Sequence, residues 1–297
     1  MLYKQIQDNK RKTILLVTLF VSLTLAIGWA VGYAFSESSI SGMVITAIIL
    51  VVYIPMTYMS ASSQVLKMSG AKEADRNEHA QLYAIVEELS LVSRVPMPKV
   101  YIIDDPALNA FATGIKPEKG AVAFTTGLLE TLNREELSGV VAHELAHIRN
   151  YDIRLMTICI ALVGVIILIA DVGTRFFFFG GNRRGGGGKR GGNPIIMIVA
   201  ILLIILAPMA AQFTRLAVSR NREYLADATA VEFTRNPEGL VRALRKISGD
   251  TRDVKKAQES TASMYISRPL KKKKKNRNNM WSTHPPIEDR IKRLQEM

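Results

Sequence analysis

The sequence predicts a mainly helical α+β protein with four apolar, membrane-spanning helices. Four long runs contain no charged side chain, and about 20 apolar residues are enough to cross the hydrocarbon core of a bilayer. The polar stretches around them show helical periodicity and two short strand-like segments. Hydrophobic residues make up 48% of the chain and charged residues 22%, a mixture typical of a membrane protein with a soluble part. The apolar runs are Thr13–Phe35, Met43–Met59, Leu155–Ala170 and Pro194–Phe213.

The first two apolar runs predict an N-terminal transmembrane hairpin over residues 1–59. Several basic residues precede the first run, whereas the short link at 36–42 contains neither Lys nor Arg. By the positive-inside rule the N-terminus is cytoplasmic, and the chain returns to the cytoplasm after Met59. A cleavable signal peptide is the alternative, but the first run is longer than the apolar region of such peptides, and a second run follows closely.

One short motif, His143-Glu144-Leu145-Ala146-His147, carries the strongest chemical signal. On a helix, residues i and i+4 lie one turn apart on the same face, so both imidazoles could reach one metal ion with Glu144 beside it. This is the His-Glu-x-x-His pattern of zinc hydrolases. Asn133 and Glu136 form a capping-box signature at the start of the same helix. The alternative is two ordinary helical histidines, because a motif this short also occurs by chance. The apolar stripe of the helix is Leu137, Val141, Leu145 and Ile148.

A third metal ligand is expected, because catalytic zinc usually has three protein ligands and one open position. Glu223 is the best candidate, and Asp227 lies one helical turn further on the same face. Glu223 would bind the metal, while Asp227 would accept a hydrogen bond from the other ring nitrogen of a ligand histidine. Alone, two acidic residues on a basic helix indicate a solvated, salt-bridged face. Beside the histidine pair, the metal site is the stronger interpretation.

Residues 60–154 and 214–297 are predicted to form two cytoplasmic halves of one catalytic domain. Residues 155–213 are then an inserted apolar hairpin with a glycine-rich basic loop. One metal ion cannot be bound from both sides of a membrane, so the hairpin must return Glu223 to the side of the histidines. A crossing hairpin is preferred, although it places the basic loop outside, against the positive-inside tendency. A re-entrant or protein-buried pair is the alternative.

The soluble halves contain further predicted elements. An amphipathic helix is expected at Asp75–Ser93, short strands at Lys99–Ile103 and Ala121–Thr125, and one long helix at Arg220–Ser248. Between the strands, the segment Asn109–Gly114 could pair with the backbone of a substrate. A plain internal strand and turn is the alternative for this segment.

The C-terminal part carries a strongly basic run at Lys271–Lys275, and the net charge of the chain is +13. A solvated loop is the ordinary interpretation of the run, and contact with anionic lipid headgroups is the functional one. Nucleic acid is not expected, because no aromatic stacking platform accompanies the run. Two prolines stiffen the backbone after His284, so its imidazole could donate to an oxyanion. The single cysteine, Cys159, excludes an intramolecular disulfide and a cysteine-based metal site.

Together these motifs resemble the HtpX-type membrane zinc metalloproteases of bacteria, relatives of the CAAX-prenyl proteases. The resemblance implies a gluzincin-like domain that hydrolyses peptide bonds of misfolded or damaged membrane proteins under stress. It also implies a location in the cell membrane, with the active site facing the cytoplasm. The matching parts are the paired N-terminal spans, Asn109–Gly114, His143–His147, the inserted hairpin, Glu223–Asp227 and Thr283–Arg290.

The resemblance further implies roles for individual residues. One zinc ion would be bound by His143, His147 and Glu223, with Glu144 as the catalytic base. His284 and Arg290 would help to bind the substrate or its oxyanion. A membrane scaffold with a structural zinc is the alternative of a different class, but the open position left by three ligands favours an enzyme. The implied substrate contacts are Asn109, Ala110, Phe111 and Ala112.

Overall fold

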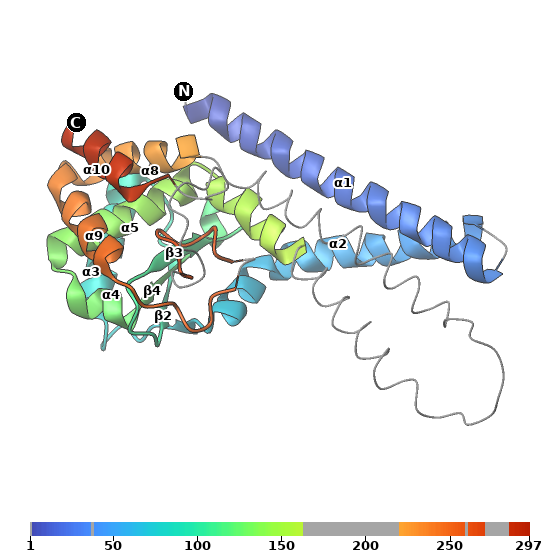
Figure 1. Ribbon diagram of the computed structural model, residues 1–297, viewed down its shortest axis with the longest axis horizontal. Helices are drawn as coiled ribbons and strands as arrows, with labels where there is room; N and C mark the ends of the chain where they lie inside the picture. The colour runs from blue at the N-terminus through green and yellow to red at the C-terminus, as the bar shows by residue number, and fades with distance from the viewer. Residues whose placement is uncertain (1, 37–38, 163–219, 259–260, 271–284) are drawn as a thin grey trace.

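The computed structural model describes residues 2–36, 39–162, 220–258, 261–270 and 285–297. Two long helices extend from a body that combines a small sheet with several helices (Figure 1). The glycine-rich loop, the fourth apolar run, the Lys271–Lys275 run and His284 lie outside the described residues. The helices are α1 (Leu2–Ser36), α2 (Ser39–Ser69), α3 (Ala80–Ser93), α4 (Thr126–Thr131), α5 (Arg134–Arg149), α8 (Arg220–Thr234), α9 (Pro237–Gly249) and α10 (Ile287–Gln295), with a 3-10 turn, η1, at Pro117–Lys119. The strands are β1 (Lys72–Glu73), β2 (Lys99–Ile103), β3 (Ala110–Thr113) and β4 (Ala121–Thr125), and residues 152–162 are also helical.

The two N-terminal helices contain the first two predicted apolar runs and pack against each other in an antiparallel pair (Figure 1). Among the described residues, Ile40–Ser69 is the one helical segment long and apolar enough to cross a membrane; it has 30 residues, and an 18-residue window within it has a mean hydropathy of 2.2. At about 1.5 Å per residue it is about 45 Å long, which exceeds the roughly 30 Å of a hydrocarbon core. A helix of this length that crosses a bilayer extends beyond the apolar layer at its end.

The sheet has the strand order β1-β2-β4-β3, so β3 is an edge strand. β2 and β4 match the predicted strands residue for residue and pair in parallel, while β1 and β3 pair antiparallel with their neighbours. Successive side chains alternate between two buried faces. Val100 and Val122 belong to the core shared with α3, α5, α8 and α9, whereas Ile103 and Ala121 belong to the core shared with α1 and α2.

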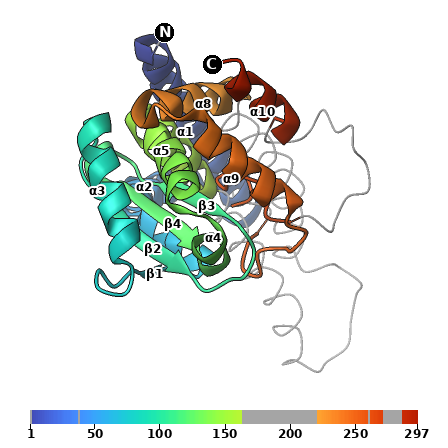
Figure 2. The same cartoon turned by 90° about the vertical axis from the view of Figure 1, so that its left-hand side faces the viewer.

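Helix α5 is the centre of the helical layer, because it contacts α3, α8, α9 and strand β3 (Figure 2). The predicted capping box is present: Asn133 accepts a hydrogen bond from the Glu136 backbone N–H, and Glu136 accepts one from the Asn133 N–H. Gly139 permits the close approach of α9, since a Cβ atom there would lie 2.8 Å from the backbone of Leu240. The predicted apolar stripe of α5 is fully packed, with Leu137, Val141, Leu145 and Ile148 buried.

The single helix predicted over Arg220–Ser248 is wrong, because the chain breaks between α8 and α9. Arg235 adopts a left-handed conformation with φ of 52°. Asn236 then caps α9 by accepting a hydrogen bond from the Gly239 N–H. Pro237 opens α9 and has no N–H with which to continue the hydrogen bonds of α8. The break allows both helices to pack against α5.

The predicted helix at Asp75–Ser93 begins later than expected, at Ala80. Asp75 instead holds a turn, in which its carboxylate accepts hydrogen bonds from the N–H groups of Asn77 and Glu78. The apolar positions predicted for this helix, Leu82, Ile85, Val86 and Leu89, are buried in the core.

Candidate metal centre

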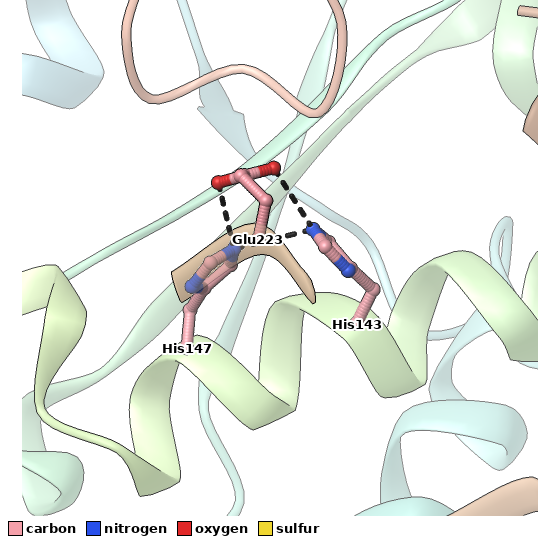
Figure 3. A group of neighbouring side chains, drawn as sticks. All are labelled: His143, His147 and Glu223. Atoms are coloured by element: carbon pink, nitrogen blue, oxygen red, sulfur yellow. Dashed lines mark hydrogen bonds and ion pairs between the residues drawn. The ribbon is translucent and has the colours of Figure 1, made fainter. Parts of the chain in front are cut away.

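Helices α5 and α8 bring three buried side chains to one point (Figure 3). His143 and His147 project from α5, and Glu223 reaches them from the first turn of α8. The two Nε2 atoms lie 3.2 Å apart. The two carboxylate oxygens of Glu223 lie 3.8 Å from His143 Nε2 and 3.6 Å from His147 Nε2. The structure thus brings together the three predicted ligands, although a long apolar insertion separates them in sequence.

The spacing of these atoms suits a small divalent cation. Zinc takes imidazole nitrogen and carboxylate oxygen at about 2.0–2.2 Å in tetrahedral geometry, which puts the ligand atoms about 3.3–3.6 Å apart. The three measured separations bracket this range. The described residues therefore fit a zinc ion both in donor type and in position.

Each histidine is oriented by a carboxylate on its other ring nitrogen. His143 Nδ1 lies 3.0 Å from Asp227 Oδ1, as the sequence predicted for a ligand histidine. His147 Nδ1 lies 3.2 Å from Oδ2 of Asp152, which is fully buried. With both Nδ1 atoms engaged, the Nε2 atoms are free to face each other and Glu223. Such partners fix the tautomer and the direction of a metal-binding imidazole.

Asp152 is a residue of the candidate site that no sequence pattern indicated. It lies just after the C-terminal end of α5, where no helical spacing connects it with His147. The Nε atom of Arg222, a buried residue next to Glu223, lies 3.6 Å from the other carboxylate oxygen of Asp152. A chemical argument could have indicated such a residue. Each metal-binding histidine usually has a hydrogen-bond partner on its second ring nitrogen, and Asp227 can be the partner of one histidine only, so a second acceptor is needed.

Burial and neighbouring charges give the two histidines different pKa values. Burial and the guanidinium of Arg290 lower the pKa of His143 to about 4, so this ring is neutral. Burial also lowers the pKa of His147, but the hydrogen bond to Asp152 and the charge of Glu223 outweigh it and raise the pKa to about 9. A metal ion binds neutral imidazole, so its binding displaces a proton from His147.

Glu144 lies on α5 beside the ligand group and is 1% exposed. Neither of its carboxylate oxygens has a hydrogen-bond partner among the described residues. Burial raises the pKa of Glu144 to about 8, although the charge of His147 acts in the opposite direction. The backbone amide of Ala112 also lowers this pKa without forming a hydrogen bond of normal geometry. A buried carboxyl group with unused oxygens, next to a metal site, has the properties of a general base.

Arg290, on α10, lies against the candidate ligand group and is fully buried. Its Nε and Nη2 atoms donate to both carboxylate oxygens of Asp227, at 2.8 and 2.6 Å, and its Nη1 donates to the carbonyl oxygen of Ile266. The guanidinium also lies 3.4 Å from Glu223 Oε2. Within the described residues Arg290 therefore holds the partner of His143, and its implied contact with substrate stays a prediction.

The predicted substrate segment forms the edge strand β3 and the residue before it. Asn109, Ala110, Phe111 and Ala112 are all buried. The Asn109 side chain donates to the Ser267 carbonyl oxygen, and the Ile266 N–H donates to the Ala110 carbonyl oxygen. Tyr265 also forms an antiparallel bridge with Phe111, so residues 265–267 of the same chain occupy the outer edge of β3 at its first two residues. Alternation along the strand points the backbone of Ala112 outward as well, toward Glu144.

Comparison with known proteins places the chain among membrane proteases. Residues 76–297 match peptidase family M48. The "Protease HtpX homolog" of Listeria monocytogenes serovar 1/2a is 50% identical over 305 residues, and that of Ligilactobacillus salivarius is 49% identical over 298 residues. Both alignments cover 100% of each chain. The crystal structure of Ste24p from S. mikatae is similar with a TM-score of 0.50 at 20% identity, covering 98% of this chain and 67% of that one.

The predicted resemblance to HtpX-type proteases is confirmed by these comparisons, and the fold is that of M48 proteases with a small sheet among helices. A metal-dependent peptidase also agrees with the two histidines and the glutamate that converge on one point. The chain therefore belongs to peptidase family M48.

Proposed function

We propose that this chain is a multi-pass membrane zinc endopeptidase that cleaves misfolded or damaged membrane proteins, with its active site facing the cytoplasm. One observation carries the proposal. His143, His147 and Glu223 present ligand atoms at zinc spacing, and the buried carboxyl group of Glu144 lies beside them with no hydrogen-bond partner in the part of the chain that the structure describes. A structural zinc in a scaffold would not need this fourth group, so the enzyme is favoured.

In peptide hydrolysis, residues of α5 and α8 would bind the metal, and one residue of α5 would transfer the proton. A zinc ion held by His143, His147 and Glu223 would supply a water of lowered pKa and polarise the scissile carbonyl. Glu144 would accept the proton of the attacking water on a carboxylate oxygen and pass it to the leaving amine. Its raised pKa suits both steps, because a group that titrates near neutral pH takes and gives a proton readily.

Strand β3 supports the binding of an extended peptide. The backbone of Ala112, on the outer edge of the strand, lies next to Glu144, while Tyr265 already bridges to Phe111 and Ile266 is bonded to Ala110. A substrate backbone that pairs with Ala112 would be placed beside the metal ligands through main-chain hydrogen bonds, which do not depend on its side chains. Tolerance of many sequences suits a protease that removes damaged proteins.

The arrangement of α1 and α2 supports a cytoplasmic active site. The N-terminal end of α1 and the C-terminal end of α2 lie at the same end of the helix pair, next to the body (Figure 1). The N-terminal end carries Lys4, Lys10, Arg11 and Lys12, which the positive-inside rule assigns to the cytoplasm. The body would then lie on that side as well.

The test compares the parent with Glu144→Gln, both purified in detergent. We expect both proteins to retain one zinc ion per chain, and Glu144→Gln to lose about 10²–10⁴-fold in cleavage of an unfolded membrane protein. Glu135→Gln, on the exposed surface of the same helix, is the matched control and should cleave at the parent rate. Parent-level cleavage by Glu144→Gln would remove the base assignment, and a metal-free parent that cleaves in excess chelator would remove the zinc mechanism.

A further inference from the structure

A groove of about 510 Å³ lies where the end of α2 meets the sheet, on a different element from the metal ligands. One wall is a single face of α2, because its lining residues there follow helical spacing. The other wall combines alternate residues along β2 with the turn η1 and the start of β4. The lining residues are Met59, Ser62, Ser63, Leu66, Lys67, Ala71, Met97, Lys99, Tyr101, Glu118, Lys119, Gly120 and Ala121.

The length of α2 indicates the level of the groove relative to the membrane. If the apolar layer begins near Ile40, about 20 residues of helix reach its far boundary near Met59. The groove begins at that residue and continues toward Lys67, which therefore lies at the level of the lipid headgroups. Exposed apolar side chains lead to it along the same face of α2: Val52, Met56 and Met59.

The lining of the groove carries positive charge. Lys67, Lys99 and Lys119 are exposed and line it, and Glu118 is the one acidic residue among the lining residues. Lys99 lies 3.6 Å from Glu73, in an ion pair whose side chains are both more than half exposed. Exposed pairs of this kind are weak and exchange readily with other partners.

We propose that this groove binds one anionic phospholipid, with its phosphate between Lys67, Lys99 and Lys119 and an acyl chain along Met59, Met56 and Val52. Along α2, Val52, Met56 and Met59 precede Lys67, so apolar side chains lie on the hydrocarbon side and a cation on the water side, as the acyl chain and phosphate of a lipid do. Lysines bind phosphate as compact cations, and the hydroxyl groups of Ser62 and Ser63 offer further donors. The volume of the groove is within the range of small-ligand sites. This site goes beyond the proposed protease function, and its test requires no activity.

The test measures lipid binding to the full chain in a non-ionic detergent by native mass spectrometry. Dioleoyl phosphatidylglycerol should bind with a stoichiometry of one at low lipid, and dioleoyl phosphatidylcholine should not compete with it. Each lysine near a lipid surface contributes about fivefold in affinity, so Lys67→Gln/Lys99→Gln/Lys119→Gln should weaken binding about a hundredfold. The matched control changes three exposed lysines that do not line the groove, Lys116→Gln/Lys255→Gln/Lys292→Gln, and should bind like the parent.

Four results would overturn the proposal. Equal weakening in the two triple variants would show attraction by net charge alone, and equal affinity for both lipids would exclude recognition of the anionic headgroup. Binding of glycerol 3-phosphate as tight as that of the lipid would make this a soluble phosphate site. Tighter binding of hexaglutamate would assign the groove to an acidic peptide. Far-UV circular dichroism and the single Lys→Gln variants separate each result from a folding defect.

Discussion

Asp152 offers a direct test of how the metal ligands are held in place. Its Oδ2 atom lies 3.2 Å from His147 Nδ1, and its side chain is fully buried. We predict that Asp152→Ala lowers zinc affinity about 100-fold and that Asp152→Asn lowers it about 10-fold. The amide oxygen of asparagine still accepts the Nδ1 proton but carries no charge, whereas alanine leaves a buried N–H without an acceptor.

The expected magnitude follows from two costs. Loss of an outer partner of a ligand histidine costs about 10–100-fold in affinity, or about 1.4–2.7 kcal/mol. A buried donor without a partner costs about 1–3 kcal/mol, which places alanine at the upper end. Asp152→Ala also removes a carboxylate 3.6 Å from the buried Arg222, so some loss of folding stability is expected in addition.

The assay is competition for zinc with a chromophoric chelator, using protein in detergent. Glu232→Ala, which removes an exposed carboxylate of α8 paired with Arg149, is the control and should bind zinc like the parent. Asp152→Asn keeps the shape of the side chain, so it reports on the ligand even if Asp152→Ala unfolds. Parent affinity in both Asp152 variants would refute the view that this carboxylate orients His147.

Three further predictions concern folding and are measured by urea unfolding in detergent. Arg290→Met should lower the unfolding free energy by about 3–5 kcal/mol, because it leaves the buried carboxylate of Asp227 without its charged partner. Arg293→Met, on the exposed side of α10, should cost at most about 1 kcal/mol, and similar losses in the two variants would contradict the assigned pairing. Glu136→Gln should destabilise the parent fold at neutral pH: burial raises the pKa of Glu136, but its hydrogen bond to a lysine of α9 holds the pKa below the usual value. Because the folded pKa is lowered, the ionised carboxylate stabilises the fold fully above the unfolded pKa of about 4.3, and this stabilisation is lost as the pH falls through the folded pKa. The difference in unfolding free energy between variant and parent should therefore shrink below about pH 4. A constant difference would count against the ion pair. Gly139→Ala should cost about 1–3 kcal/mol through its clash with α9, while Gly249→Ala, with open space around it, should be neutral or slightly stabilising; a neutral Gly139→Ala would mean that the helices separate freely.

Local patterns predicted much of the helical layer and the sheet. The capping box at Asn133 and Glu136, the apolar stripe of α5 and the bounds of β2 and β4 are all present as expected. These features depend on residues within a few positions of one another, so the sequence contains all the information that forms them. The break after Thr234 also has a local signal in Asn236 and Pro237, but the apolar pattern on both sides of it is regular and helical, so a single helix was predicted.

The sequence by itself determined which side chains could bind a metal, because i to i+4 spacing on a helix places His143 and His147, and likewise Glu223 and Asp227, on one face. The packing of α5 against α8 decided that these pairs meet and which carboxylate contacts which imidazole, and the packing of α10 brought Arg290 to Asp227 and Glu223. It also decided that the chain itself occupies the edge of β3 at Ala110. Such contacts join residues far apart in sequence, and their geometry is set by the packing of whole elements, which no local pattern encodes.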